Sequence, residues 1–391
     1  MDWRRRRVRL VVGLVMTMVL VAPVVVRGQD DEEPDLDVPY VPTNQAVVEQ
    51  MLKMARVNAA DFVMDLGCGD GRIVVTAARL YGARAIGVDL DPQRIKQSNR
   101  NARKARVTDL VTFEKADIMQ TDIRRASVVT LFLLPEVNLM VRPRLFAQLA
   151  PGTRIVSNGF DMSDWHADLT VNHPRAYEKR IYFWLIPAPV GGTWQWQTTL
   201  GDQTLGSTLR LDQQFQTVQG TLQSGGAQET PITNTVLSGR DLAFVGTLRI
   251  GQDDVAVAYR GSAVGDAVQG TQEVRGGPHA GVYPWTARRE PADVCGQWEV
   301  ESKALPKGSG TLCLRRDGTG LAAAFVRKGA KDEVPLAGFY AWGTSVRVEV
   351  PTEDGVRILR GSLGPDGGTG TVTAEDGEAT TPWSAKRREA E

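Results

Sequence analysis

Apolar and polar positions follow two different patterns along the chain, and the change falls near residue 189. From about residue 40 to residue 189, short apolar runs of strand length alternate with stretches in which apolar positions recur every three or four residues, as in helices. The pattern predicts strands at 62–65, 85–88, 111–114, 127–133, 153–157 and 179–186, and helices at 44–56, 72–80, 92–105 and 136–148. Strands alternating with helices form a doubly wound α/β sheet, which binds ligands at the carboxyl ends of its strands.

Residues 190–391 have short alternating runs broken by glycine, which is typical of all-β structure. The pattern indicates two copies of one unit, because Trp194 and Trp298 open equivalent segments and Trp285 and Trp383 close them. We therefore predict two β units, at 190–290 and 291–391, each an antiparallel barrel or sandwich of about eight strands. These tryptophans could line a ligand cup, but a tryptophan near each end of a meander more often fills the core.

Two cysteines of the second β unit, Cys295 and Cys313, fall on its first two expected strands. Two interpretations stay open for them. They form a cross-strand disulfide, which an exported chain permits, or they are two small buried apolar side chains.

A glycine-rich turn follows the first predicted strand of the α/β region. Gly67, Gly69 and Gly71 stand at alternate positions, so the backbone can turn tightly and approach a ligand closely. Asp89 lies 20 residues after Gly69, at the end of the next predicted strand. A carboxylate at that place can accept hydrogen bonds from a ribose diol.

The spacing of this turn separates two classes of ligand. Dinucleotide sites use Gly-x-Gly-x-x-Gly and face a pyrophosphate, whereas this chain has Gly-x-Gly-x-Gly. Asp65 and Asp70 add two acids to the turn, which suits a ligand with positive charge and no phosphate. S-adenosylmethionine is such a ligand. The alternative is an ordinary strand-to-helix turn with solvated acids.

On these residues the sequence resembles the seven-strand (class I) S-adenosylmethionine-dependent methyltransferases, over roughly Tyr40 to Pro187. The resemblance implies a Rossmann-like domain at 40–189 in which the glycine turn and Asp65 hold the cofactor and Asp89 binds its ribose. It also implies that Asp117, with Ile118, contacts the adenine amino group. These positions specify the cofactor and say little about the methyl acceptor.

Three further segments, at 39–43, 131–135 and 156–160, resemble the protein-lysine methyltransferase family that modifies mitochondrial inner-membrane proteins, and its bacterial relatives. The resemblance implies a protein lysine as acceptor and places Tyr40 and Thr43 beside the cofactor. Thr43 can also be the N-cap of the helix that follows a proline-stiffened lead-in.

A lysine acceptor, whose amine has an ordinary pKa of about 10.4, must lose a proton before it attacks. The acids nearest the expected mouth are Glu136 and Asp161, and either is a candidate catalytic residue that takes the proton or holds the ammonium. Glu136 is explained as well by a favourable charge at a helix N-terminus. Cys68, in the turn, is expected to pack, because transfer from a sulfonium needs no enzyme nucleophile.

Composition narrows the range of partners. Lysine plus arginine equals aspartate plus glutamate at 46 each, so no overall basic field attracts nucleic acid. The Asn-Pro-Pro-Tyr type of motif that marks adenine and glutamine methylation is absent at 134–136, which read Leu-Pro-Glu. His166, His173 and His279 lack ligand spacing, so no metal site is predicted.

An arginine-rich start precedes the apolar stretch 10–26. It predicts a secretory signal peptide or an uncleaved membrane anchor at 1–28, with possible membrane association through this segment. Residues 29–39 carry six acids and read as a solvated acidic linker. Either interpretation places the rest of the chain on the exoplasmic side, in the periplasm.

That location conflicts with a cofactor made in the cytosol. The cofactor reaches the compartment or is exported bound, or the start codon is misassigned, or the site is a relic. Intact acids at Asp65, Asp89 and Asp117 argue against a relic. Two rivals to a lysine methyltransferase stay open: a methyltransferase for a small molecule or lipid, and an envelope binding protein whose β units recognise the ligand while the α/β domain is a scaffold.

Overall fold

The computed structural model describes residues 41–290, 294–317, 320–336, 338–342, 344–364, 367–374 and 380–388. The signal or anchor predicted at 1–28, the linker predicted at 29–39 and Tyr40 lie outside the described residues and stay predictions. Within the described residues, no helix combines the length and the apolar character that a membrane crossing requires.

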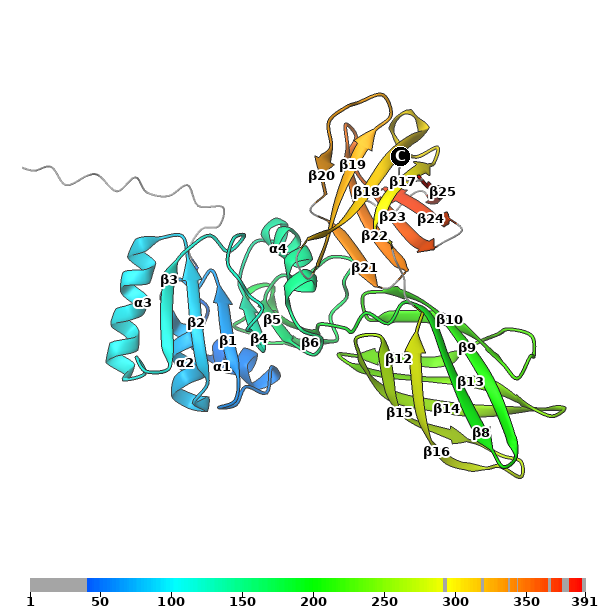
Figure 1. The fold of residues 1–391 in the computed structure, drawn as a ribbon. Coiled ribbons are helices and arrows are strands. Elements are labelled where there is room, and N and C mark those ends of the chain that lie inside the picture. The colour runs from blue at the N-terminus through cyan, green and yellow to red at the C-terminus, as the bar shows by residue number, and fades with distance from the viewer. Residues whose placement is uncertain are drawn as a thin grey trace, which may run out of the picture. The chain divides into compact units, whose positions relative to one another are not determined.

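The first part of the structure is the α/β domain expected from the pattern (Figure 1). Its helices are α1 Gln45–Met54, α2 Arg72–Tyr81, α3 Pro92–Ala105 and α4 Pro135–Gln148. Its strands are β1 Phe62–Leu66, β2 Arg84–Asp89, β3 Val111–Lys115, β4 Val128–Leu131, β5 Arg154–Asn158, β6 Leu169–Asn172 and β7 Arg180–Leu185, with the short 3-10 helix η1 Tyr177–Lys179 before β7.

The strand order in this seven-stranded sheet is β3-β2-β1-β4-β5-β7-β6. Strands β1 to β5 run parallel, and β7 is antiparallel to β5 and β6. The order reverses between β1 and β4, and a crevice for ligands forms at such a switch point, outside the carboxyl ends of the strands. The sequence prediction did not include β6, a short edge strand.

Two apolar cores cover the two faces of the sheet. One is built from α1, α2 and α3 with alternate residues of the strands, and Val47, Val48, Met51 and Leu52 of α1 are fully buried in it. The other contains α4 and the opposite faces of β1, β4 and β5. Strands β1 and β4 are therefore covered on both sides, as parallel strands usually are, which explains their continuous apolar runs.

The rest of the chain forms two curled, barrel-like antiparallel sheets. The first contains β8 Gly192–Leu200, β9 Gln203–Gln214, β10 Thr217–Ser224, β11 Thr230–Pro231, β12 Thr233–Ser238, β13 Asp241–Ile250, β14 Asp253–Val264, β15 Ala267–Val274 and β16 Gly281–Arg289. The second contains β17 Gly296–Glu301, β18 Ser309–Asp317, β19 Gly320–Arg327, β20 Val334–Pro335, β21 Phe339–Trp342, β22 Ser345–Thr352, β23 Gly355–Gly364, β24 Gly367–Ala374 and β25 Thr380–Arg387.

Among the described residues, both sheets have nine strands in the same order, with the first strand paired to the last, as expected for two copies of one unit. Trp194 Nε1 donates to Val190 O at 2.7 Å, and Trp298 Nε1 makes the equivalent bond to Val294 O at 2.9 Å. Trp194, Trp285, Trp298 and Trp383 are all buried in the two cores. These tryptophans therefore fill the interior and do not line a cup.

Cys295 and Cys313 are thiols that are not joined to each other. Cys313 is buried on β18, while Cys295 precedes β17 and is half-buried. The register sets Gln297 opposite Cys313, so Cys295 is displaced along the strand from a directly facing position. For Cys313, the structure thus supports the interpretation as a small buried apolar side chain and not as half of a disulfide.

A buried charged cluster links α4 of the α/β domain to the second β unit. Arg142 of α4 donates to Asp164 Oδ1 at 2.7 Å and to Glu349 Oε1 on β22 at 3.0 Å. Arg347, 2% exposed on β22, contacts the same two carboxylates, and Arg360 donates to Asp164 Oδ2 at 2.8 Å. Burial alone raises the pKa of Asp164, but Arg347 and Arg142 outweigh it, and the resulting pKa is below its ordinary value.

Candidate active site

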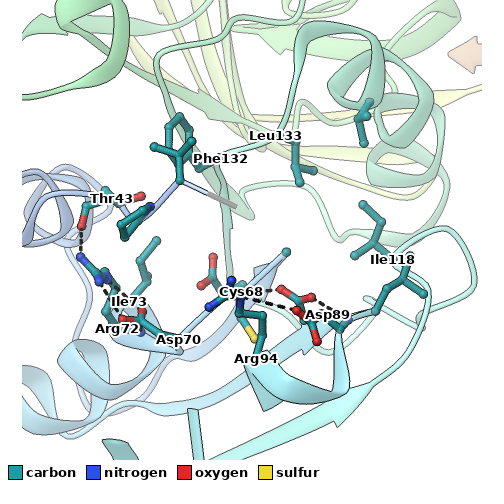
Figure 2. Close-up of a pocket in the computed structure, with 18 of the residues that line it drawn as sticks. Thr43, Cys68, Asp70, Arg72, Ile73, Asp89, Arg94, Ile118, Phe132 and Leu133 are labelled. Carbon is teal, nitrogen blue, oxygen red and sulfur yellow. Dashed lines mark hydrogen bonds and ion pairs between the residues drawn. The ribbon is translucent and has the colours of Figure 1, made fainter. Parts of the chain in front are cut away.

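A cavity opens at the carboxyl ends of β1, β2 and β4, at the switch point of the sheet (Figure 2). Its lining includes the segment 41–43 before α1, the glycine turn after β1, the end of β2, residues 117–119 after β3 and the beginning of α4. Seven of the predicted cofactor residues line it: Thr43, Asp65, Gly67, Gly69, Asp89, Asp117 and Ile118.

The glycine turn is held against the end of β2 by three backbone donors. The N–H groups of Gly67 and Cys68 both donate to Val88 O at 2.9 Å, and Gly69 N donates to Asp89 Oδ2 at 2.8 Å. Gly71 does not line the cavity. It is the N-cap of α2, with φ 76°, and a Cβ there would lie 2.6 Å from the Phe113 ring. Glycine is therefore required to start α2 directly behind the turn.

Asp89 is fixed by the backbone on both of its carboxylate oxygens. Oδ2 accepts from Gly69 N, and Oδ1 accepts from Asp91 N at 2.9 Å. Each oxygen keeps a further lone pair. The side chain lines the cavity at the end of β2 with both oxygens held in place, which is the arrangement that the predicted contact with a ribose requires.

Asp65 is the most deeply buried acid of the cavity, with 2% of its surface exposed. Its Oδ1 accepts from Thr130 Oγ1 at 2.7 Å. Burial raises the pKa of Asp65 to about 7, against the hydrogen bond from Thr130, and the charges of Asp89 and Asp70 raise it further. A cation bound nearby would favour the ionised carboxylate.

Asp70 forms an ion pair with Arg72, so its negative charge is already balanced within the protein and is not left for a ligand. Arg72 Nη2 lies 2.7 Å from Asp70 Oδ2, and Arg72 Nη1 donates to Thr43 O at 2.6 Å. Arg72 thereby ties the lead-in segment before α1 to the glycine turn. This contact joins residues 29 positions apart, and no motif pointed to it.

The prediction of Thr43 as a possible N-cap is wrong by one residue. Asn44 caps α1, and its side chain accepts from Ala46 N at 3.0 Å. Thr43 is instead buried and lines the cavity. The placement therefore agrees with the other interpretation, in which Thr43 lies beside the cofactor.

The part of the cavity beyond β3 is formed by Asp117, Ile118 and Met119. Asp117 Oδ1 accepts from Met119 N at 2.7 Å, which fixes the turn there. The opposite wall follows β4 and is apolar, with Phe132, Leu133, Val137 and Met140. Figure 2 shows Phe132 and Leu133 across the cavity from Cys68 and Asp89. The predicted site did not include this wall.

The two candidate catalytic acids do not line the cavity. Glu136 is exposed in the first turn of α4, and Asp161 is exposed in the loop after β5. Asp161 Oδ1 accepts from Ser163 N at 3.1 Å, and its charge acts on Arg180. Their catalytic role stays a prediction. Cys68 lines the cavity, and burial raises its pKa strongly, helped by Asp65, so it is an inert thiol near neutral pH.

Comparison with known proteins agrees with this geometry. The family model "ANTKMT methyltransferase domain" matches residues 65–169, so the β units lie outside it. A protein-lysine N-methyltransferase of Saccharolobus islandicus is 45% identical over 130 residues, which make up 33% of this chain and 81% of that protein. The adenine nucleotide translocase lysine N-methyltransferase of mouse is 33% identical over 130 residues, and this chain spans just over half of it, 56%.

Among solved structures, an RNA methyltransferase of Salinibacter ruber in complex with S-adenosyl-L-homocysteine is 48% identical. The similarity covers 37% of this chain and 93% of that one, with a TM-score of 0.36. The glycine turn and the cavity acids Asp65 and Asp89 indicate the same class of enzyme as the relatives that match the α/β domain. The chain belongs to the same family as the Saccharolobus enzyme, and it is an S-adenosylmethionine-dependent methyltransferase.

Proposed function

We propose that this enzyme methylates the side-chain amine of lysine in a protein. The observation that carries the proposal is the 45% identity to a protein-lysine N-methyltransferase over 81% of that protein's length. Relatives named as lysine N-methyltransferases of adenine nucleotide translocase and of an ATP synthase component support the same class of acceptor. They are matched over only 53 to 60% of their lengths.

The residues of the cavity fit the proposed cofactor. S-adenosylmethionine supplies a methyl carbon whose bond to the sulfonium sulfur breaks, leaving its electron pair on sulfur, as the lysine nitrogen bonds to that carbon. Asp65 and Asp89 give the cavity negative charge, and Asp89 presents a fixed acceptor for a diol. Asp117 and Ile118 close the far end, where an adenine would lie.

The chain's contribution to rate is orientation and exclusion of water. The backbone bonds of the glycine turn hold one side of the cavity, and the apolar wall with Phe132 and Leu133 forms the other. Burying a neutral amine against this apolar wall costs less free energy than burying an ammonium, because a buried charge without a partner is unfavourable. The wall therefore favours the form of lysine that can attack.

The test is transfer of isotope-labelled methyl from S-adenosylmethionine by the full chain to a mixture of protein and RNA, followed by hydrolysis of the protein to amino acids. The proposal predicts label in methylated lysine. Asp89→Asn serves as the control that weakens the cofactor site. Label only in RNA, only in small molecules or lipids, or only in amino acids other than lysine would contradict the proposal.

A further inference from the structure

Three aromatic side chains, Phe132, Phe160 and Tyr177, form a compact cluster beside the cofactor cavity, which we call the aromatic row. Phe132 follows β4, Phe160 follows β5, and Tyr177 begins η1 just before β7. The ring centroids are 6.4 Å apart for Phe132 and Phe160, 4.9 Å for Phe160 and Tyr177, and 5.8 Å for Phe132 and Tyr177. Phe132 lines the cavity and Tyr177 is 45% exposed, so the row leads from the cavity to solvent.

The outer end of the row is held in place by the backbone. Gly159 has φ 84°, and a Cβ there would lie 2.7 Å from Tyr177 Cβ, so the chain packs directly against the tyrosine. Tyr177 N donates to Asn158 Oδ1 at 3.1 Å. Glu178 and Lys179 both have positive φ, at 47° and 54°. Such conformations persist only where the surroundings enforce them, so Tyr177 stands on a fixed turn.

The sheet order puts this row on the side of the cavity where the reacting end of the cofactor is expected. Asp117 follows β3, Asp89 ends β2 and Asp65 lies on β1, in the order of the strands across the sheet. A cofactor with its adenine at Asp117 and its ribose at Asp89 extends its methionine part toward β1 and β4. Its sulfonium would then be on the side of the cavity that Phe132 lines, where the row begins.

We propose that Phe132, Phe160 and Tyr177 form the path by which the acceptor lysine reaches the cofactor, with the incoming ammonium held by cation–π attraction against the exposed ring of Tyr177 before the neutral amine reaches the wall at Phe132. This inference rests on the proposed lysine acceptor and identifies how that acceptor is recognised. The ring faces attract an ammonium and any methylated ammonium. Once the lysine nitrogen loses its proton, the rings still contact it. A carboxylate in their place would favour the charged ammonium more strongly and so oppose the loss of the proton that attack requires.

The charged groups near the row agree with this assignment. Asp161 follows Phe160 and Glu178 follows Tyr177, and the charges of both act on Arg180. Glu136 lies in the first turn of α4 and does not line the cavity. Among the described residues, the carboxylates that line the cavity belong to β1, β2 and the turns after β1, β2 and β3, not to the segment after β4 that carries Phe132; they are Asp65, Asp70, Asp89, Asp91 and Asp117.

The first test compares two peptides as inhibitors of the full chain. One carries trimethyl-lysine and the other its uncharged carbon analogue, which has the same shape. The inference predicts that the charged peptide inhibits about two- to fivefold more strongly, as an exposed cation–π contact would give. Equal inhibition by the two peptides would overturn it, and this result needs no altered protein.

The second test compares Tyr177→Leu with Leu80→Ala, a control at an exposed apolar residue of α2 outside the row. Tyr177→Leu is expected to raise the KM for a lysine peptide about two- to fivefold and to abolish the preference for the charged inhibitor, while cofactor affinity is kept. Tyr177→Phe, which keeps the ring, should recover most of this loss. An unchanged KM in Tyr177→Leu would overturn the inference. Absence of lysine methylation by the unaltered enzyme would instead refute the proposed function.

Discussion

Asp65→Asn should make the protein more stable and the enzyme less able to bind its cofactor. Asp65 is 2% exposed and accepts a hydrogen bond from Thr130, which an asparagine amide oxygen can also accept. Its pKa is raised from 3.8 to about 7, chiefly by burial. Ionising it in the folded protein therefore costs free energy that the unfolded chain does not pay.

The size of the effect follows from this shift. About three pKa units correspond to about 4 kcal/mol, at 1.36 kcal/mol per unit. Because the pKa in the folded state is raised, the stability that protonated Asp65 contributes is fully present below pH 3.8 and is lost as the pH rises through about 7. Removing the charge should recover about 2–4 kcal/mol at about pH 8, less whatever the new amide N–H groups cost.

Urea unfolding of both proteins, followed by helical circular dichroism, measures the difference. The signal reports the α/β domain, because all four α-helices of the described residues lie there. The stabilisation by Asp65→Asn should be small at about pH 4, grow up to about pH 7 and stay constant above it. A difference independent of pH, or a variant less stable at about pH 8, would refute this reasoning.

Cofactor binding provides an independent test of the raised pKa of Asp65. A bound cation should lower the pKa of Asp65, so binding near pH 6 should release up to about one proton. Calorimetry in two buffers of different ionisation enthalpy detects this proton. The release should be absent in Asp65→Asn, and an equal release from that variant would assign the proton to another group.

Three further predictions concern separate parts of the structure. Gly71→Ala, whose Cβ would meet the Phe113 ring at 2.6 Å, should lower stability by about 1–3 kcal/mol, measured by thermal unfolding; an unchanged midpoint would show that the turn relaxes. Asp164→Asn should cost about 3 kcal/mol above pH 4 by leaving buried Arg347 poorly paired. Since the pKa of Asp164 is lowered, this difference should vanish in acid, and urea midpoints across pH check it. Asp117→Ala should weaken S-adenosylmethionine binding about tenfold, the loss of one strong hydrogen bond, as measured by calorimetry.

The α/β fold, and the position of most of the predicted cofactor residues around one cavity, could be predicted because they depend on local pattern. The glycine turn follows β1, Asp89 ends β2 and Asp117 follows β3, and the ends of parallel strands meet at one edge of a sheet. The count of about eight strands in each β unit was one too low. The two-residue strands β11 and β20 are too short to produce an alternating pattern.

Contacts between distant residues could not be predicted in this way. Arg72 reaches the carbonyl of Thr43 from 29 positions away, and Arg142 pairs with Glu349 from 207 positions away. The aromatic row brings Phe132 and Tyr177 together only because β5 and β7 are neighbours in the sheet. The chain runs antiparallel through β6 and β7, and this brings Tyr177 close to Phe132.

Calorimetric titration of the protein with S-adenosylmethionine tests the central claim most directly, because every assigned role depends on the cavity at the switch point. The account predicts one site with affinity on the order of micromolar, weakened by Asp89→Asn. No binding to the correctly folded protein, or equal binding by that variant, would contradict the assignment of this cavity as the cofactor site.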